Sequence, residues 1–92
     1  MEIQQTDNTE NGMFYVEQSG EKLAKMYYSW RGTDRIIISH TEVDDRLRGT
    51  GAGKQMVTRA VEFAREKGIK IVPLCPFAKS VLEKVEAFRD VL

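Results

Sequence analysis

The sequence is poor in cysteine and proline, carries no net charge and has no long apolar run. Its one cysteine, Cys75, excludes an intramolecular disulfide framework and is typical of a protein in a reducing cytoplasm. No apolar run approaches the roughly 20 residues of a membrane-spanning helix, and the first residues lack the apolar part of a secretory signal. We therefore expect a cytoplasmic protein with no membrane partner.

Charge and length limit the expected partners and the number of domains. Fourteen basic and fourteen acidic residues balance, so we expect no nucleic-acid partner. The 92 residues are expected to form one small domain, 1–92, as a monomer or a weak homodimer. The polar first segment, 1–12, is expected to be flexible. We predict no metal site.

The feature around which the sequence is organised is a glycine-rich turn, 48–54, between a β-rich run and a helix-like run. Its glycines alternate with small residues, so no bulky side chain separates the backbone from a ligand. A strand that leads through such a turn into a helix directs several backbone N–H groups and the positive helix end at one point. The turn therefore predicts an anion site, most naturally for phosphate.

The spacing of the glycines distinguishes between phosphate-binding motifs. A Walker A loop requires glycine where Arg48 stands and serine or threonine where Gln55 stands. A dinucleotide-binding fingerprint requires a third glycine where Lys54 stands. The pattern that does fit is Arg-x-x-Gly-x-Gly, on Arg48, Gly51 and Gly53. A tight turn that binds nothing is the alternative.

The chain before the turn predicts an antiparallel meander. Alternating apolar residues indicate two strands, and three consecutive isoleucines indicate a third that is central and buried on both faces. The strands are expected over 13–18, 23–30 and 35–43, joined by turns at 19–22 and 31–34.

After the turn, apolar residues at helical spacing predict a helix over 53–67, with Gly68 as its C-terminal cap. A short aliphatic strand, 69–72, follows, and the strand–helix–strand order implies that it runs parallel to the third strand. Pro73 has no N–H, so pairing between these two strands should end there and leave unpaired backbone groups in a gap. A C-terminal helix is expected over 77–88 and can break near 85–87.

Three motifs follow one another in the order and spacing of a known family: His40-Thr41-Glu42-Val43, Leu47-Arg48-Gly49-Thr50-Gly51 and Val72-Pro73-Leu74-Cys75-Pro76-Phe77. Over about residues 13–90 the chain resembles a subfamily of very short proteins of the GNAT superfamily of N-acetyltransferases. The resemblance implies a mixed α/β fold of the minimal GNAT-like acyl-CoA N-acyltransferase type. In that fold an antiparallel meander precedes a parallel strand–helix–strand unit and a C-terminal helix. Acetyl-coenzyme A is then the cofactor, and an amine is the acceptor.

The resemblance assigns the coenzyme to the gap and the turn. The backbone of Thr41 to Val43 is expected to pair with pantetheine between the two parallel strands. The side chain of Arg48 is expected to contact the coenzyme phosphates, and Lys54 and Arg46 could also reach them. The pyrophosphate itself is expected to bind the backbone amides of the turn, those of Gly49, Thr50, Gly51, Ala52 and Gly53.

Three side chains are candidates for catalysis. A lysine-like amine with a pKa of about 10.4 is mostly protonated at neutral pH, so acetyl transfer needs a group that takes its proton. His40 and Glu42 lie two residues apart on a strand, hence on one face beside the gap, and either could act. Cys75 precedes a helix whose N-terminus favours the thiolate, and the resemblance makes an acetyl-cysteine intermediate conceivable. A backbone-bonded histidine, a solvent-facing carboxylate and a packed cysteine are the structural alternatives.

The sequence also departs from the larger members of the superfamily. It leaves no room for the helical N-terminal portion that walls the acceptor site in those members, and no tyrosine follows the last parallel strand to act as general acid. We therefore predict an N-acetyltransferase with an unknown amine acceptor. A non-catalytic acyl-CoA-binding module is the alternative, and a scaffold without a ligand is the third reading.

Overall fold

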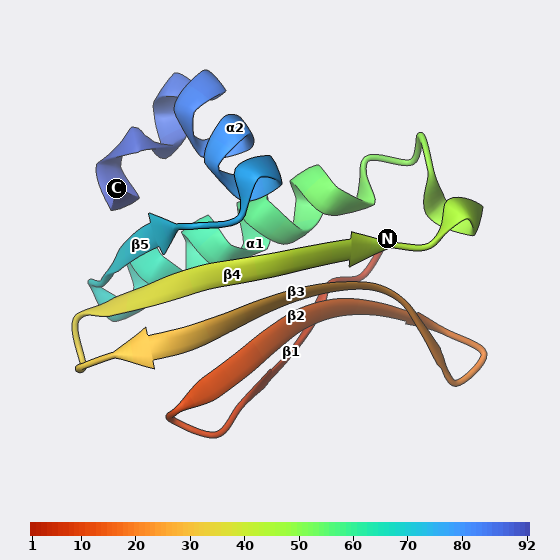
Figure 1. The fold of residues 1–92 in the computed structure, drawn as a ribbon, viewed down its shortest axis with the longest axis horizontal. Coiled ribbons are helices and arrows are strands. Elements are labelled where there is room, and N and C mark those ends of the chain that lie inside the picture. The colour runs from red at the N-terminus through yellow and green to blue at the C-terminus, as the bar shows by residue number, and fades with distance from the viewer.

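The computed structural model describes residues 1–92 as a five-stranded mixed sheet with two helices and two 3-10 turns. The strands lie in chain order across the sheet; the first four are antiparallel neighbours and the last pairs with the fourth in parallel (Figure 1). The mixed α/β fold predicted from the sequence is confirmed. The strands are β1 (Gln4–Asp7), β2 (Asn11–Gln18), β3 (Glu21–Arg31), β4 (Arg35–Val43) and β5 (Lys70–Pro73).

The helices form after β4. Helix α1 (Ala52–Lys67) ends where Gly68 adopts the left-handed conformation predicted for its cap. Helix α2 (Pro76–Lys84) begins with a proline and is capped by Val85, so it ends earlier than the predicted range 77–88. The break predicted near 85–87 is confirmed, because a 3-10 turn, Glu86–Val91, follows. No helix is both long enough and apolar enough to span a membrane.

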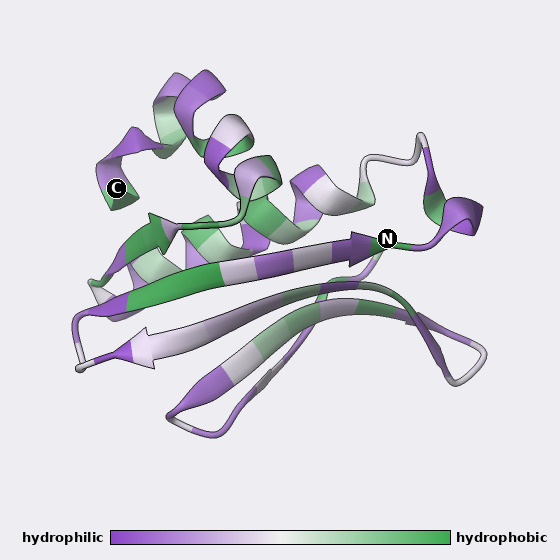
Figure 2. Cartoon of the chain, in the orientation of Figure 1, coloured by the Kyte–Doolittle hydropathy of each residue, from purple (hydrophilic) through white to green (hydrophobic).

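The core lies between α1 and one face of the sheet. That face carries Phe14, Met26, Ile36 and Ile38, all fully buried. The alternation predicted for the meander is therefore confirmed, but Ile37, on the opposite face, is only half-buried. β4 is an interior strand between β3 and β5, not the middle strand of the sheet, and no helix covers its second face at Ile37 (Figure 1). In Figure 2 β4 is hydrophobic over its first half and mostly polar over its second.

One strand, β1, is absent from the sequence prediction, which expects a flexible segment over 1–12. The strand pairs with β2 at the edge of the sheet. It has no apolar alternation, so it lacks the signal by which strands are recognised. Its attachment is polar instead: Asp7 accepts hydrogen bonds from the hydroxyl of Tyr28 and the indole N–H of Trp30.

The gap predicted between the parallel strands is present. Pairing between β4 and β5 ends at Ile38 and Pro73, as the missing proline N–H requires. The carbonyl of Ile38 then accepts hydrogen bonds from the N–H groups of both Leu74 and Cys75, each at 3.0 Å. A bulge in β4 at Ser39 accompanies this divergence. The second half of β4 is consequently unpaired on the side facing α2.

Candidate functional site

The glycine-rich turn opens α1 with a cluster of free backbone donors. Gly49 and Gly51 both have positive φ, 79° and 81°, and Gly51 is the N-cap of α1. The N–H groups of Gly49, Gly51, Gly53 and Lys54 have no acceptor within the chain. No atom lies within 4 Å of the position that a Cβ would take at Gly49 or Gly51, so the space in front of the turn is open. Unpaired N–H groups at a helix start form an anion site.

Thr50 shapes this turn and does not present its own amide. Its N–H and its hydroxyl both donate to the carbonyl of Leu47, at 3.1 and 2.6 Å. The hydroxyl oxygen in turn accepts from the N–H of Ala52 at 3.3 Å. Of the five backbone amides predicted for the pyrophosphate, those of Gly49, Gly51 and Gly53 are free, and that of Lys54 joins them.

The basic side chains around the turn differ in whether carboxylates within the chain already bind them. The guanidinium of Arg46 donates to the carboxylates of both Glu21 and Asp44. Its hydrogen bonds to Asp44, from the side chain and from the backbone N–H, lower the pKa of Asp44 to about 2. Arg46 thus joins Glu21 to Asp44 and is not available as a phosphate ligand. Arg48 pairs with Asp45 at 2.7 Å, but both side chains are more than four-fifths exposed, so little free energy holds the pair. The ammonium of Lys54 has no partner, and the first turn of α1 contains no acidic residue.

Gly53 has a different role from the other two glycines. A Cβ at Gly53 would lie 2.6 Å from the ring of Phe77, in the first turn of α2. The ring therefore packs directly against the backbone at the start of α1 and fixes the two helix N-termini side by side. The sequence pattern predicts ligand approach at Gly53 and no role for Phe77; the contact joins residues 24 positions apart, which no local pattern reveals.

Gly53→Ala is expected to destabilise the fold by about 1 kcal/mol or less, because the added methyl group displaces the ring of Phe77, which is partly exposed and can turn away, and because alanine is the better helix former. Chemical denaturation of the variant measures the loss. Phe77→Leu in the same chain should restore much of it, since a smaller side chain makes room for the methyl group. A double variant as unstable as the sum of the single variants would show that the contact is not the cause.

The free edge of β4 faces the gap. The N–H of Asp44 donates to the carbonyl of Leu23 in β3, so alternation turns the backbone groups of Thr41 and Val43 to the other side. Val43, Leu74 and Phe77 are the three exposed large apolar side chains that lie away from the chain ends, and all three belong to the segments around this gap. An amide-bearing chain with apolar parts can pair and pack there.

Cys75 lies at the closed end of the gap. It is the N-cap residue of α2 and is 5% exposed. Its Sγ lies 3.3 Å from Oγ1 of Thr41. Burial raises the pKa of the thiol, but the Thr41 hydroxyl and the backbone N–H groups of Ala78, Phe77 and Thr41 stabilise the thiolate, and the net effect lowers the pKa. The hydrogen bonds around Sγ thus favour the thiolate, although the thiol itself is buried.

His40 and Glu42 share a face of β4, as predicted, with Nε2 and Oε2 4.0 Å apart. The pairing register places them on the sheet face that α1 does not cover, opposite Thr41 and Cys75. Both side chains are more than half exposed, and the His40 ring stacks on Tyr27 with centroids 6.1 Å apart. Of the three predicted catalytic residues, His40 and Glu42 thus lie on the uncovered face of the sheet and Cys75 lies on the face toward the helices.

A sheet whose parallel strands diverge beside a glycine turn and a helix start defines an acyl-coenzyme A N-acyltransferase fold. A family model described as GCN5-related N-acetyl-transferase matches residues 13–91. The chain belongs to the GCN5-related N-acetyltransferase family.

Two solved structures and one curated sequence illustrate the relationship. A GCN5-like protein of Staphylococcus aureus is 40% identical, with a TM-score of 0.76, over 98% of this chain and 85% of that one. A protein of Clostridium acetobutylicum crystallised with acetyl-CoA shares the fold at 20% identity and a TM-score of 0.68, over 86% of this chain and 58% of that one. Protein NATD1 of Xenopus tropicalis is 28% identical over 61 residues, which are 66% of this chain and 56% of the relative. The match spans just over half the length of that curated relative.

Proposed function

We propose that the protein transfers an acetyl group from acetyl-coenzyme A to an amine. The observation that carries the proposal is the set of four free N–H groups at the start of α1, those of Gly49, Gly51, Gly53 and Lys54. They would bind the pyrophosphate, with Arg48 and Lys54 supplying positive charge. The carbonyl of Thr41 and the backbone of Val43 would bind pantetheine, since the N–H of Thr41 faces the sulfur of Cys75. The Clostridium acetobutylicum protein of the same fold was crystallised with acetyl-CoA, which is consistent with this cofactor.

Two catalytic routes fit the residues around the gap. In the direct route, Glu42 or His40 accepts a proton from the incoming amine, through a water where needed, and the amine attacks the thioester carbonyl. The new C–N bond forms as the C–S bond breaks, and coenzyme A leaves as a thiolate that takes up a proton. An acceptor that approaches from the uncovered sheet face would meet these two side chains.

In the covalent route, the Cys75 thiolate attacks the carbonyl first. A thioester bond to Sγ forms, and coenzyme A leaves as its thiolate and is protonated. The amine then attacks the acetyl-cysteine and gives up a proton to water as the new C–N bond forms, and the C–S bond breaks to release the Cys75 thiolate. The hydrogen bonds that lower the pKa of Cys75 increase the fraction of thiolate and so favour this route.

The second candidate function is a module that binds acyl-coenzyme A without turnover. One observation favours it: α2 and the residues after it contain no tyrosine that could protonate the leaving thiolate. The acceptor of the first candidate is proposed only as an amine, of a small molecule or a protein, and the proposed location is the cytoplasm.

One pair of measurements separates the two functions. Calorimetric titration with acetyl-coenzyme A is expected to give saturable binding at one site per chain. Release of the coenzyme A thiol is then followed with a panel of primary amines, including a polyamine and a lysine peptide. Amine-dependent release supports the enzyme, and binding without release supports the module. A folded protein that binds no acetyl-coenzyme A contradicts both.

A further inference from the structure

A second hollow of the molecule lies away from the glycine turn. It is a cleft of about 480 Å³ between the C-terminal half of α1, the strand β1 and the turn that joins β3 to β4. Since α1 has 16 residues, about 24 Å of helix separates its two ends. None of the residues proposed for coenzyme binding or catalysis lines this cleft. Its volume is in the range of small-molecule sites.

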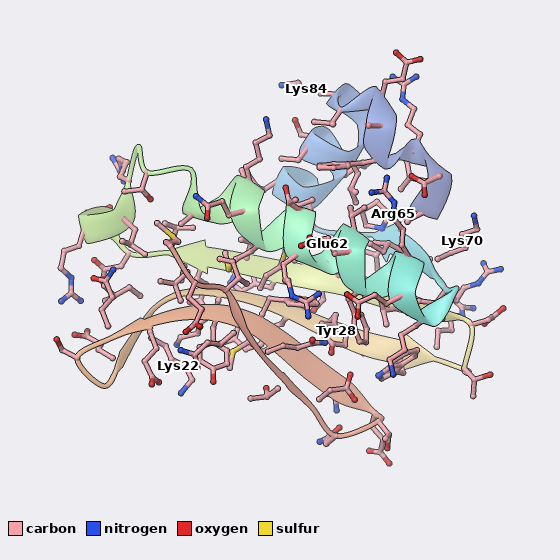
Figure 3. All side chains as sticks on the ribbon, turned by 180° about the vertical axis from the view of Figure 1, so that it is seen from behind. Lys22, Tyr28, Glu62, Arg65, Lys70 and Lys84 are labelled. Carbon is pink, nitrogen blue, oxygen red and sulfur yellow. The ribbon has the colours of Figure 1, made fainter.

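One wall of the cleft carries a pre-organised carboxylate. Asp7 accepts hydrogen bonds from the Tyr28 hydroxyl, from the Trp30 indole N–H at 2.8 Å and from the Thr9 N–H at 2.7 Å. Tyr28 itself is held between the sheet and α1 and accepts a further bond from Gln5 (Figure 3). A carboxylate has about four acceptor positions, so one remains for a ligand donor. These bonds fix the direction in which it points.

The same cleft also carries the complementary charge. Burial raises the pKa of Asp7, but the hydrogen bonds of that carboxylate and the nearby charge of Lys67 lower it overall. Lys67, in the last turn of α1, lines the cleft, and its ammonium makes no hydrogen bond or ion pair within the chain. The neighbouring cations behave differently: Arg65 donates to Asp90, and Lys70 donates to the carbonyl of Asp90, both toward the C-terminal segment (Figure 3). Lys67 is therefore the basic group left free at this end of the helix to meet an anion in the cleft.

Aromatic side chains form the surface between the two charges. Trp30 and Phe63 line the cleft with their ring centroids 6.0 Å apart and their planes at 69°. Phe63 is 7% exposed and fixed in the core, whereas Trp30 is half-buried and presents part of its ring. A further ring could stack on Trp30. The cleft thus offers a carboxylate, an ammonium and an aromatic surface within one cavity.

We propose that this cleft binds a free aromatic α-amino acid. The ligand ammonium would meet Asp7, its carboxylate would meet Lys67, and its side chain would lie on Trp30. A simple organic cation would be repelled by Lys67, and a simple anion by Asp7, so a zwitterion fits both groups. The site is separate from the acetyl-coenzyme A site and does not depend on it.

The only tryptophan of the chain is Trp30, so its fluorescence reports on this cleft alone. Titration with L-phenylalanine, which does not absorb at the excitation wavelength of tryptophan, is expected to give a saturable change. Phenethylamine lacks the carboxylate and 3-phenylpropanoate lacks the ammonium, and each should bind roughly tenfold more weakly or worse. Amide shifts of Thr9, Gly32 and Thr33 in nuclear magnetic resonance spectra provide a second readout that does not require a fluorescence change.

Lys67→Met is the matched variant, because it removes the charge and leaves the hydrogen bonds of Asp7 intact. It should weaken L-phenylalanine by roughly tenfold and leave phenethylamine unchanged or tighter. Gly51→Val, at the other end of α1, should not alter L-phenylalanine binding. The proposal is overturned if neither readout saturates, or if Lys67→Met affects all three ligands alike.

Discussion

Gly51→Val is expected to abolish acetyl-coenzyme A binding in a protein that still folds. The Cβ would enter the open space in front of the turn, where the pyrophosphate is proposed to approach the free N–H groups. Loss of two or more hydrogen bonds to a charged group corresponds to a decrease in affinity of roughly 100-fold or more. Calorimetric titration of the variant and of the parent with acetyl-coenzyme A measures this decrease in affinity.

The substitution also strains the backbone, because Gly51 has a φ of 81°. A side chain in that conformation costs about 1–2 kcal/mol. Gly20→Val is the matched control: Gly20 has a φ of 78°, also with no atom near its Cβ position, and lies in the turn between β2 and β3. Both variants should lose similar stability in denaturant, but only Gly51→Val should lose binding. Equal loss of binding in the two variants would mean that strain, not a blocked site, is responsible.

Cys75→Ser is expected to lower turnover by roughly 100-fold or more if the covalent route operates, because a serine hydroxyl at the same position is a far weaker nucleophile. Affinity for acetyl-coenzyme A should change little, since Cys75 belongs to the closed end of the gap and not to the phosphate turn. Thiol release under saturating amine measures the rate, and intact-protein mass spectrometry detects the acetyl adduct in the parent when amine is withheld. Unchanged turnover in a folded Cys75→Ser protein would leave only the direct route.

Thr41→Val tests the same nucleophile through its pKa. Removal of the hydroxyl beside Sγ takes away a group that lowers the pKa of Cys75, so the pKa should rise and less thiolate should be present at neutral pH. The rising limb of the rate against pH should then move to higher pH, with the plateau nearly retained. A packed, unreactive cysteine would give no such movement.

Much of the fold is predictable from short-range pattern. Helical spacing and Gly68 locate α1 closely, helical spacing and the expected break near 85–87 locate α2, and Pro73 predicts where β5 leaves β4. The prediction misses β1, because an edge strand held by Asp7 and two aromatic partners has no apolar alternation to reveal it. Polar hydrogen bonds between positions more than 20 residues apart leave no periodic signal.

The sequence alone determined the glycine turn, the proline-ended strand and the motifs that identify the family, because each depends on residues close together in the chain. Only the tertiary structure decided how those pieces act together. In the folded protein, the ring of Phe77 packs against Gly53, and Arg46 binds two carboxylates. His40 and Glu42 lie on the opposite face of β4 from Cys75. These outcomes depend on strand register, on a bulge at Ser39 and on contacts between distant residues, and all three are set by the packing of the whole chain.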